Sequence, residues 1–238
     1  QLWNFDKLGD SDFDVSTMKV PDKEDIAQAM AKVDYTQLKY DDATGILTTE
    51  NPDIQIELGA IGKGYAIEQA KDVLKRSDAS GGMVSAGSSI YVCGTKKDGS
   101  RFRVALRDPR GDENSAIGVL TLSDTTISTS GDYERYFEKD GVRYHHILDP
   151  RTGYPADSGL MQVTIICDDS VIGDALSTAC FVLGLDKGMN LAAKYGVNAI
   201  FVDTDKNIWY NNPDVLNYFE FTGKDSGYVL NEYNQARS

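Results

Sequence analysis

The chain has 238 residues, of which 41% are hydrophobic and 26% are charged. These values are close to those of ordinary globular proteins, which argues against disorder, a collagen-like repeat or a coiled coil, and the length suits one large domain or two small ones. The formal net charge of −13 repels polyphosphate backbones. Nucleic acid is therefore a poor candidate partner, and an anionic substrate would need a local cation.

No apolar run approaches the ~18 residues of a membrane span. Gln1 is followed directly by LWNFD, without the basic start and apolar run of a signal peptide. The three cysteines, Cys93, Cys167 and Cys180, are an odd number without a CxxC spacing. We therefore expect neither a disulfide framework nor a thiolate metal site, and we expect the cysteines to be buried as small hydrophobic side chains.

The first half of the chain predicts two helices among short strands. Pro21 suits a first-turn position, and Ile26, Met30 and Val33 form one apolar stripe, which predicts a helix over 21–33. Runs rich in β-branched residues and bounded by Asp and Gly predict strands. In chain order, the further expected elements are strands at 38–40, 45–49 and 53–58, a helix at 62–76, and strands at 83–86, 90–93, 102–106, 119–122 and 125–128.

The second half begins with the apolar run MQVTIIC at 161–167, which predicts a buried strand. The remaining expected elements are helices at 171–184 and 187–195 and strands at 199–203, 208–210 and 218–221. Helices and hairpins are interspersed without strict alternation, which favours an α+β fold with mixed or antiparallel sheets and flanking helices. We place one domain over 1–222 and a polar, loosely held C-terminal tail over 223–238.

Asp174 and Thr178 stand four residues apart on the helix expected at 171–184, so both side chains lie on one face, about 5–6 Å apart at Cβ. A carboxylate and a hydroxyl at this spacing can present hard oxygens to one cation. An acidic first turn that favours the helix dipole would explain the carboxylate equally well. However, both polar groups interrupt an otherwise apolar helix, and a buried carboxylate is costly unless it is paired or bound to a metal.

The stretch from Glu57 to Gly64, ELGAIGKG, runs from an expected strand through glycines into a helix. Free N–H groups at such a helix start favour an anion, so a nucleotide-phosphate site is one interpretation. The glycine spacing matches neither GxxxxGK(S/T) nor the dinucleotide pattern GxGxxG. A tight strand-to-helix turn is the more common explanation of such a stretch.

His145 and His146 are the only histidines of the chain. Neighbouring residues of a strand point to opposite faces, so we do not expect the pair to chelate one metal. An isolated histidine is usually structural or exposed, but histidine is also the side chain best placed to act as a base near neutral pH. Residues 149–153 form a turn by composition, and the hydroxyls of residues 126–131 could bind phosphate or ribose or simply end a strand.

Taken in order, five stretches resemble the FAD:protein FMN transferase family, the ApbE-like flavin transferases. They are ELGAIGKGYAIE (57–68), SAGSSIYVCG (85–94), ISTSGDYERYF (127–137), HHILDPRTGYP (145–155) and DALSTACFVLG (174–184). LWNF near the N-terminus is similar to a further family segment, and the resemblance extends to about residue 222. It implies a T-fold-like architecture.

The resemblance also implies a Mg²⁺-dependent enzyme that splits FAD at its pyrophosphate, passes FMN to a Thr or Ser hydroxyl of an acceptor flavoprotein and releases AMP. Asp174 and Thr178 would supply side-chain oxygens to Mg²⁺, the backbone carbonyl of Ala60 would be a third ligand, and Ser177 would contribute nearby. An oxygen-rich site of this kind suits Mg²⁺ better than Zn²⁺.

For the flavin nucleotide, the resemblance implies that Glu57 and Lys63 contact FAD and that Leu148 lines its pocket. His146, at the family's His-x-x-Asp-Pro position, would be the general base for the acceptor hydroxyl. Family members carry a longer region upstream, including a GAFD-type stretch that helps to hold the flavin ring. They are often secreted or lipid-anchored, so we expect an extracytoplasmic, membrane-anchored lipoprotein.

Two alternatives stay open at this point. Water could replace the acceptor hydroxyl, which would make the protein an FAD pyrophosphatase that yields FMN and AMP. The chain could also be a flavin-binding module without turnover, although the presence of Asp174, Thr178 and His146 argues against this.

Overall fold

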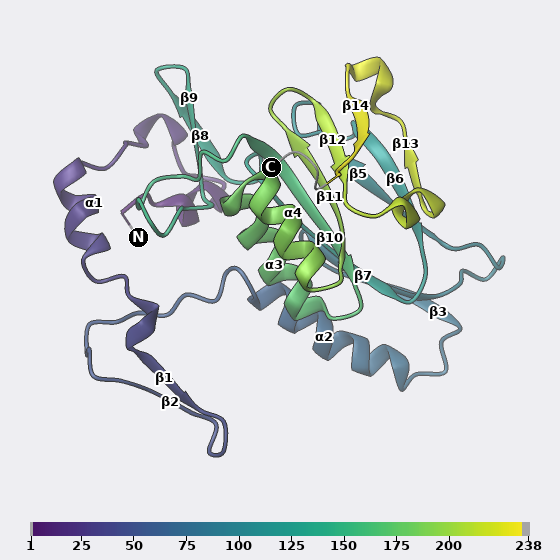
Figure 1. The fold of residues 1–238 in the computed structure, drawn as a ribbon, viewed down its shortest axis with the longest axis horizontal. Coiled ribbons are helices and arrows are strands. Elements are labelled where there is room, and N and C mark those ends of the chain that lie inside the picture. Colours follow the sequence, from purple (N-terminus) through teal and green to yellow (C-terminus); the bar gives the residue numbers. More distant parts are fainter. Residues whose placement is uncertain (1, 235–238) are drawn as a thin grey trace. The chain divides into compact units, whose positions relative to one another are not determined.

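The structure, a computed structural model, describes residues 2–234, and the chain divides into two compact units (Figure 1). The first unit comprises Gln1–Glu57 and Glu134–Ala156, and the second comprises Leu58–Tyr133 and Asp157–Ser238. The chain therefore leaves the second unit after β7 and returns to it before β10. Among residues 2–234, no helix combines the length and apolar character needed to cross a membrane.

The second unit is built on a seven-stranded sheet in the order β14-β12-β11-β10-β7-β4-β3. Its strands are β3 (Gly81–Ala86), β4 (Ser89–Gly94), β7 (Thr125–Gly131), β10 (Leu160–Cys167), β11 (Asn198–Asp203), β12 (Asn207–Tyr210) and β14 (Val229–Glu232). All neighbours are antiparallel except β12 and β14, which are parallel, so the sheet is mixed. The expected apolar run forms the central strand β10, of which all but the last residue are buried.

Three helices lie over one face of this sheet (Figure 1): α2 (Gly62–Lys75), α3 (Ser170–Leu183) and α4 (Leu185–Lys194). A three-stranded sheet in the order β13-β6-β5 packs against the other face. It consists of β5 (Phe102–Arg107), β6 (Ala116–Leu122) and β13 (Phe219–Phe221). The main hydrophobic core fills the space between the two sheets, with Val92, Leu120 and Ile200 fully buried in it. The expected α+β class, with a mixed sheet and flanking helices, is confirmed.

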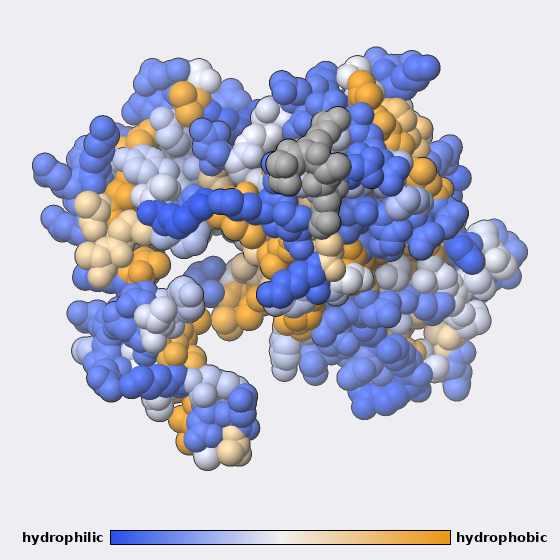
Figure 2. Space-filling model, viewed as in Figure 1, coloured by the Kyte–Doolittle hydropathy of each residue, from blue (hydrophilic) through white to orange (hydrophobic). Residues whose placement is uncertain are grey.

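The first unit contains α1 (Lys23–Met30) and two hairpins, β1 (Leu38–Asp41) with β2 (Ile46–Thr49), and β8 (Tyr136–Lys139) with β9 (Val142–His145). Its core is an aromatic cluster of Trp3, Phe5, Phe137, Tyr144 and Tyr154. Short 3-10 helices lie at Phe5–Gly9, Val15–Thr17 and Tyr35–Gln37 in this unit, and at Pro213–Asn217 and Gly223–Ser226 in the second. Hydrophobic side chains reach the surface over the β1–β2 hairpin (Figure 2).

Two expected elements of the first unit differ in the structure. The strand expected at 53–58 is absent, and these residues form an irregular segment with no partner strand, in which Ile56 is exposed. The helix expected over 21–33 is shorter, because Asp22 is the N-cap of α1 and Val33 lies beyond its end, exposed to solvent. Ile26 and Met30 of the expected stripe still pack in the core of the first unit, whereas residues 53–58 have no partner strand.

Two features of the second unit also differ. A turn forms at Asp98–Gly99, a residue pair typical of hairpins, but its flanking strands β4 and β5 belong to different sheets and do not pair. The segment expected as a loosely held tail from residue 223 instead contains β14, and Tyr228 is buried in the main core. The second unit therefore extends past residue 222; residues 235–238 lie outside the described part of the chain.

Candidate active site

The carboxylate of Asp174 is buried between α3 and the start of α2. Its side chain is 1% exposed, and it accepts a hydrogen bond from the backbone N–H of Gly64 at 2.8 Å. Gly64 is the third residue of α2, whose own N-cap, Ile61, provides no side-chain hydrogen bond. Because the first N–H groups of a helix have no partner within the helix, Asp174 caps α2 from 110 residues away in the sequence.

The close contact between the two helices requires a glycine. A Cβ atom on Gly64 would lie 2.2 Å from the backbone oxygen of Ser170 and 2.8 Å from Cβ of Asp174. No side chain larger than hydrogen fits at this separation. The glycine-rich stretch before α2 thus brings one helix against the other, and the carboxylate of Asp174 reaches the helix start for that reason.

Lys63 and Ser89 complete the surroundings of the Asp174 carboxylate. Nζ of Lys63 lies 3.1 Å from Oδ1, and the hydroxyl of Ser89 donates to the same oxygen at 3.3 Å. The buried charge is therefore paired, as burial of an ion requires. Lys63 and Asp174 are predicted site residues, but neither their contact nor the role of Ser89, which lies in the block 85–94, follows from the sequence pattern.

A chain of hydroxyl groups lies beside this carboxylate. Ser177, fully buried, donates to the backbone oxygen of Asp174 at 2.9 Å and contacts the hydroxyl of Ser130 at 2.9 Å. Ser130 also lies 3.1 Å from the hydroxyl of Thr178. The structure thus brings Asp174, Thr178 and Ser177 together with a strand hydroxyl on β7.

Only part of the expected hydroxyl cluster at 126–131 takes part in this arrangement. Ser128 and Ser130 share the face of β7 toward α3, whereas Thr129 pairs with the hydroxyl of Thr164 at 2.9 Å. Successive residues of a strand point to alternate faces. This alternation was the sequence signal that could have distinguished Ser128 and Ser130, which face α3, from Thr129, which does not.

The donor set around Asp174 fits Mg²⁺ by its chemistry. Among residues 2–234, no three or more His, Cys, Asp and Glu side chains are grouped closely enough to hold a metal ion. A cation at Asp174 would therefore depend on one carboxylate together with hydroxyl and carbonyl oxygens. Mg²⁺ is bound in proteins in this way, through one or two carboxylates, retained waters and substrate phosphates.

The other predicted site residues lie outside this contact network. Ala60 is exposed in the loop before α2, and no described contact joins its carbonyl to Asp174. Glu57, Leu148 and His146 belong to the first unit. The roles that sequence analysis assigned to these four residues remain predictions.

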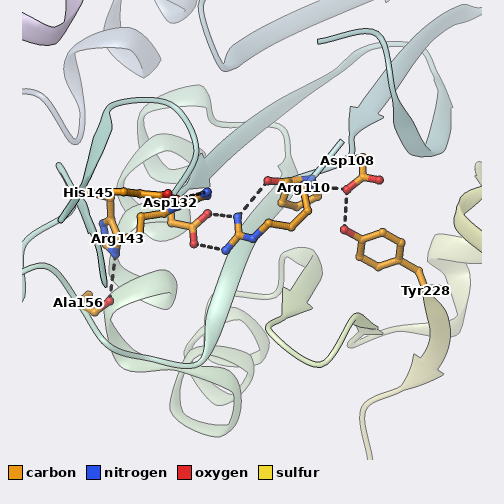
Figure 3. Close-up of polar contacts among 9 residues, drawn as sticks. Asp108, Arg110, Asp132, Arg143, His145, Ala156 and Tyr228 are labelled. Atoms are coloured by element: carbon orange, nitrogen blue, oxygen red, sulfur yellow. Dashed lines mark hydrogen bonds and ion pairs between the residues drawn. The ribbon is translucent and has the colours of Figure 1, made fainter. Parts of the chain in front are cut away.

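The two histidines have different surroundings. His145 is 5% exposed, its Nε2 lies 3.1 Å from the carbonyl of Ala156, and its Nδ1 lies 3.3 Å from the backbone N–H of Ile147 (Figure 3). A carbonyl only accepts and an N–H only donates, so this ring is neutral with its proton on Nε2. His146 follows the end of β9 and is half-buried. His145 therefore holds two backbone groups of its own unit, whereas the role of His146 stays a prediction.

The turn expected after the histidines is present. The Asp149 carboxylate accepts from the backbone N–H of Arg151 at 2.8 Å and forms an ion pair with its guanidinium at 2.7 Å. These hydrogen bonds, with the nearby positive charge, lower the pKa of Asp149 despite its burial. Gly153 has φ +75°, and a Cβ there would lie 2.8 Å from Ile26 of α1, so a glycine is required.

A cavity of about 450 Å³ lies within the first unit, next to this turn. Its walls are largely apolar and include Trp3, Met30, Leu148 and Gly153. Leu148 and Trp3 of the LWNF block line this same cavity, and the role of Leu148 in an FAD pocket stays a prediction.

An ion pair between the buried carboxylate of Asp132 and an exposed arginine of the second unit was not expected from the sequence. The guanidinium of Arg110 contacts both carboxylate oxygens of Asp132, at 2.7 and 2.6 Å (Figure 3). The backbone N–H of Arg110 donates to Asp108, which also accepts from the hydroxyl of Tyr228 at 2.6 Å. Asp132 directly follows β7, so this network fixes the point at which the chain leaves the second unit.

Comparisons with a family model, with curated proteins and with solved structures all point to the same family. The model of the ApbE family matches residues 1–201. A FAD:protein FMN transferase of Klebsiella pneumoniae is 37% identical over 212 residues, covering 89% of this chain and 64% of the relative. One of Treponema pallidum is 34% identical over 224 residues, covering 87% and 59%. The crystal structure of an ApbE protein from Thermotoga maritima has a TM-score of 0.75 and 37% identity, covering 85% of this chain and 66% of that one. The chain thus spans about three fifths of the length of these relatives.

Proposed function

Because this chain belongs to the ApbE family, we propose that it transfers FMN from FAD to a Thr or Ser hydroxyl of an acceptor flavoprotein and releases AMP. The observation that carries the proposal is the buried carboxylate of Asp174, which lies beside Lys63 and the hydroxyl groups of α3. In a chain of net charge −13, Lys63 supplies a cationic group at this place that an anionic pyrophosphate could contact.

In the proposed reaction, the acceptor hydroxyl oxygen attacks the phosphorus of the FMN half of FAD. The bond from that phosphorus to the bridging oxygen breaks, and AMP leaves with the electron pair. The hydroxyl proton passes to a base. Such phosphoryl transfers depend mainly on positioning and on neutralisation of charge, which the chain's own cationic and hydrogen-bonding groups provide.

Mg²⁺ would be held by side-chain oxygens of Asp174 and Thr178, with the carbonyl of Ala60 as a third ligand and Ser177 supporting the helix backbone. When bound, it would neutralise the developing charge on the phosphate oxygens. The Ser130 hydroxyl, which contacts both Ser177 and Thr178, orients the hydroxyl of Thr178.

We assign the role of general base to His146 and contacts with FAD to Glu57, Lys63 and Leu148. His145 is excluded from this role because both of its ring nitrogens are occupied by backbone groups. The apolar cavity lined by Leu148 and Trp3 suits a flat aromatic ring system such as that of a flavin.

The test is incubation of the chain with FAD and Mg²⁺, with and without an acceptor domain that carries the hydroxyl residue. We expect AMP by chromatography and acceptor-bound flavin fluorescence in a denaturing gel, both lost in Asp174→Asn. Asp168→Asn is the control. Asp168 is exposed in the loop just before α3, so this variant should still form both products. AMP without acceptor flavin would indicate a pyrophosphatase, and bound FAD without AMP would indicate a flavin-binding module; either result contradicts the proposal.

An extracytoplasmic location with a lipid anchor is also part of the proposal, and it rests on the family resemblance alone. Fractionation of the producing cells, followed by detection of the protein in membrane and soluble fractions, tests it. Recovery of the protein from the cytoplasmic fraction would contradict it.

A further inference from the structure

Lys63 is the cationic partner of the buried Asp174 carboxylate. Its Nζ lies 3.1 Å from Oδ1, the oxygen that also accepts from Ser89. The two side chains differ strongly in exposure, since Asp174 is 1% exposed and Lys63 is 38% exposed. The ion pair therefore joins a fixed, buried anion to a cation on a flexible chain that reaches the surface.

A divalent cation bound to Asp174 would lie close to the position of this ammonium group. The repulsion between a +2 and a +1 charge at a given distance is twice as strong as the attraction within the ion pair. Lys63 and the divalent cation therefore compete for one carboxylate, and the cation can bind there only if it displaces the ammonium group.

The surroundings favour release of the lysine. Gly64 and Ser89 would continue to hold the Asp174 carboxylate through hydrogen bonds that do not involve Lys63. Within residues 2–234, the only other polar contact of Nζ is a weak one, at 3.4 Å, with the backbone carbonyl of Gly59 in the loop before α2. The lysine can thus leave while the carboxylate keeps its place.

We propose that Lys63 is a built-in counter-ion of Asp174 that is displaced by a divalent cation, and that the released ammonium group then becomes available to the pyrophosphate of FAD. Without the metal, the ammonium group of Lys63 balances the charge of the buried carboxylate. This inference rests on the proposed function, because it takes Asp174 as a metal ligand.

The first experiment is calorimetric titration of the full chain with Mg²⁺ in the absence of flavin. We expect Lys63→Gln to bind Mg²⁺ at least about tenfold more tightly than the unchanged protein. A neighbouring positive charge weakens the binding of a proton to a carboxylate by about one to three decades, and it opposes the binding of Mg²⁺ in the same direction. Lys63→Arg keeps the competing charge and should bind like the unchanged protein.

Lys75→Gln is the matched control, since Lys75 is exposed in the last turn of the same helix and its loss changes the net charge equally. If Lys63→Gln gains no more affinity than Lys75→Gln, the displacement is wrong. Asp174→Asn separates the two proposals. Loss of Mg²⁺ binding in this variant supports the metal site even if the displacement fails, whereas unchanged binding contradicts the metal site and the displacement together.

A second experiment needs no variant and so does not depend on folding of Lys63→Gln. The unchanged chain is acetylated with acetic anhydride with and without Mg²⁺, and the modified lysines are quantified by mass spectrometry. We expect the modification of Lys63 to increase several-fold with Mg²⁺ relative to that of Lys75. An unchanged or decreased ratio would overturn the proposal.

Discussion

Gly64 and Asp174 lie in direct contact, although 110 residues separate them in the chain: the backbone N–H of Gly64 donates to the Asp174 carboxylate at 2.8 Å. This contact caps α2 and holds α2 against α3. It also fixes the position of the only predicted metal-binding carboxylate. A change at Gly64 should therefore affect stability and chemistry together.

We expect Gly64→Ala to lower the free energy of unfolding by about 1–3 kcal/mol, the usual cost of overpacking, because its Cβ would meet the backbone of Ser170 at 2.2 Å. Flavin transfer should fall as well, since the carboxylate loses its place. Gly62→Ala is the control: nothing lies within 4 Å of a Cβ there, and alanine favours a helix. Thermal unfolding of both variants measures the difference, and equal melting temperatures would contradict the contact.

We expect Ser130→Ala to reduce flavin transfer more than stability. The variant loses the hydroxyl that contacts both Ser177 and Thr178, and one hydrogen bond contributes about 0.5–1.5 kcal/mol to folding. Thr129→Val removes a comparable hydroxyl pair, with Thr164, on the other face of β7. It should cost similar stability and leave transfer unchanged. A parallel loss of activity in both variants would show that Ser130 acts only through folding.

Alanine substitutions of the two histidines should have different effects, one on the rate of flavin transfer and the other on stability. His146→Ala is expected to slow flavin transfer by about 10²–10⁴-fold, the usual loss for a general base, with little change in stability. His145→Ala leaves the Ala156 carbonyl and the Ile147 N–H without their ring partner, so we expect a loss of about 1–3 kcal/mol in unfolding free energy. Initial rates and urea unfolding curves measure both, and a normal rate in His146→Ala would exclude the base.

The Asp149–Arg151 pair predicts a pH-dependent contribution to stability. The pKa of Asp149 is lower in the folded state, first through the hydrogen bonds from Arg151, so the folded state favours the ionised carboxylate. This contribution is complete above the ordinary carboxyl pKa near 4 and disappears as the pH falls through the folded value. Asp149→Asn should therefore be less stable than the unchanged protein at pH 7, and the difference should shrink below about pH 4 in urea unfolding series. A constant difference would contradict the shift.

Removal of residues 223–238 should destabilise the second unit. The deletion takes away β14 and Tyr228, whose side chain is buried in the main core and donates to Asp108. We expect a lower and broader thermal transition. Tyr228→Phe, which loses only the hydroxyl, should cost about 1 kcal/mol. Unchanged unfolding of the deletion variant would restore the earlier view of a loosely held tail.

The sequence alone determined the local features of this protein. The apolar run at 161–167 became the buried strand β10, and the stripes at 62–76 and 171–184 became α2 and α3. Each of these segments packs an apolar side on its neighbours, and the spacing of apolar residues is sufficient to identify it. The spacing of Asp174 and Thr178 on one helix face is likewise a local property.

The tertiary structure decided which distant residues meet. The capping of α2 by Asp174, the ion pair with Lys63 and the separation of Ser130 from Thr129 depend on how closely two helices and a strand approach each other. The absent strand at 53–58 and the added strand β14 have the same origin, since a strand forms only where a partner edge is available. The spacing of apolar residues in the sequence indicates which face each segment can bury. Hydrogen bonds between distant segments form only when folding brings their backbones together.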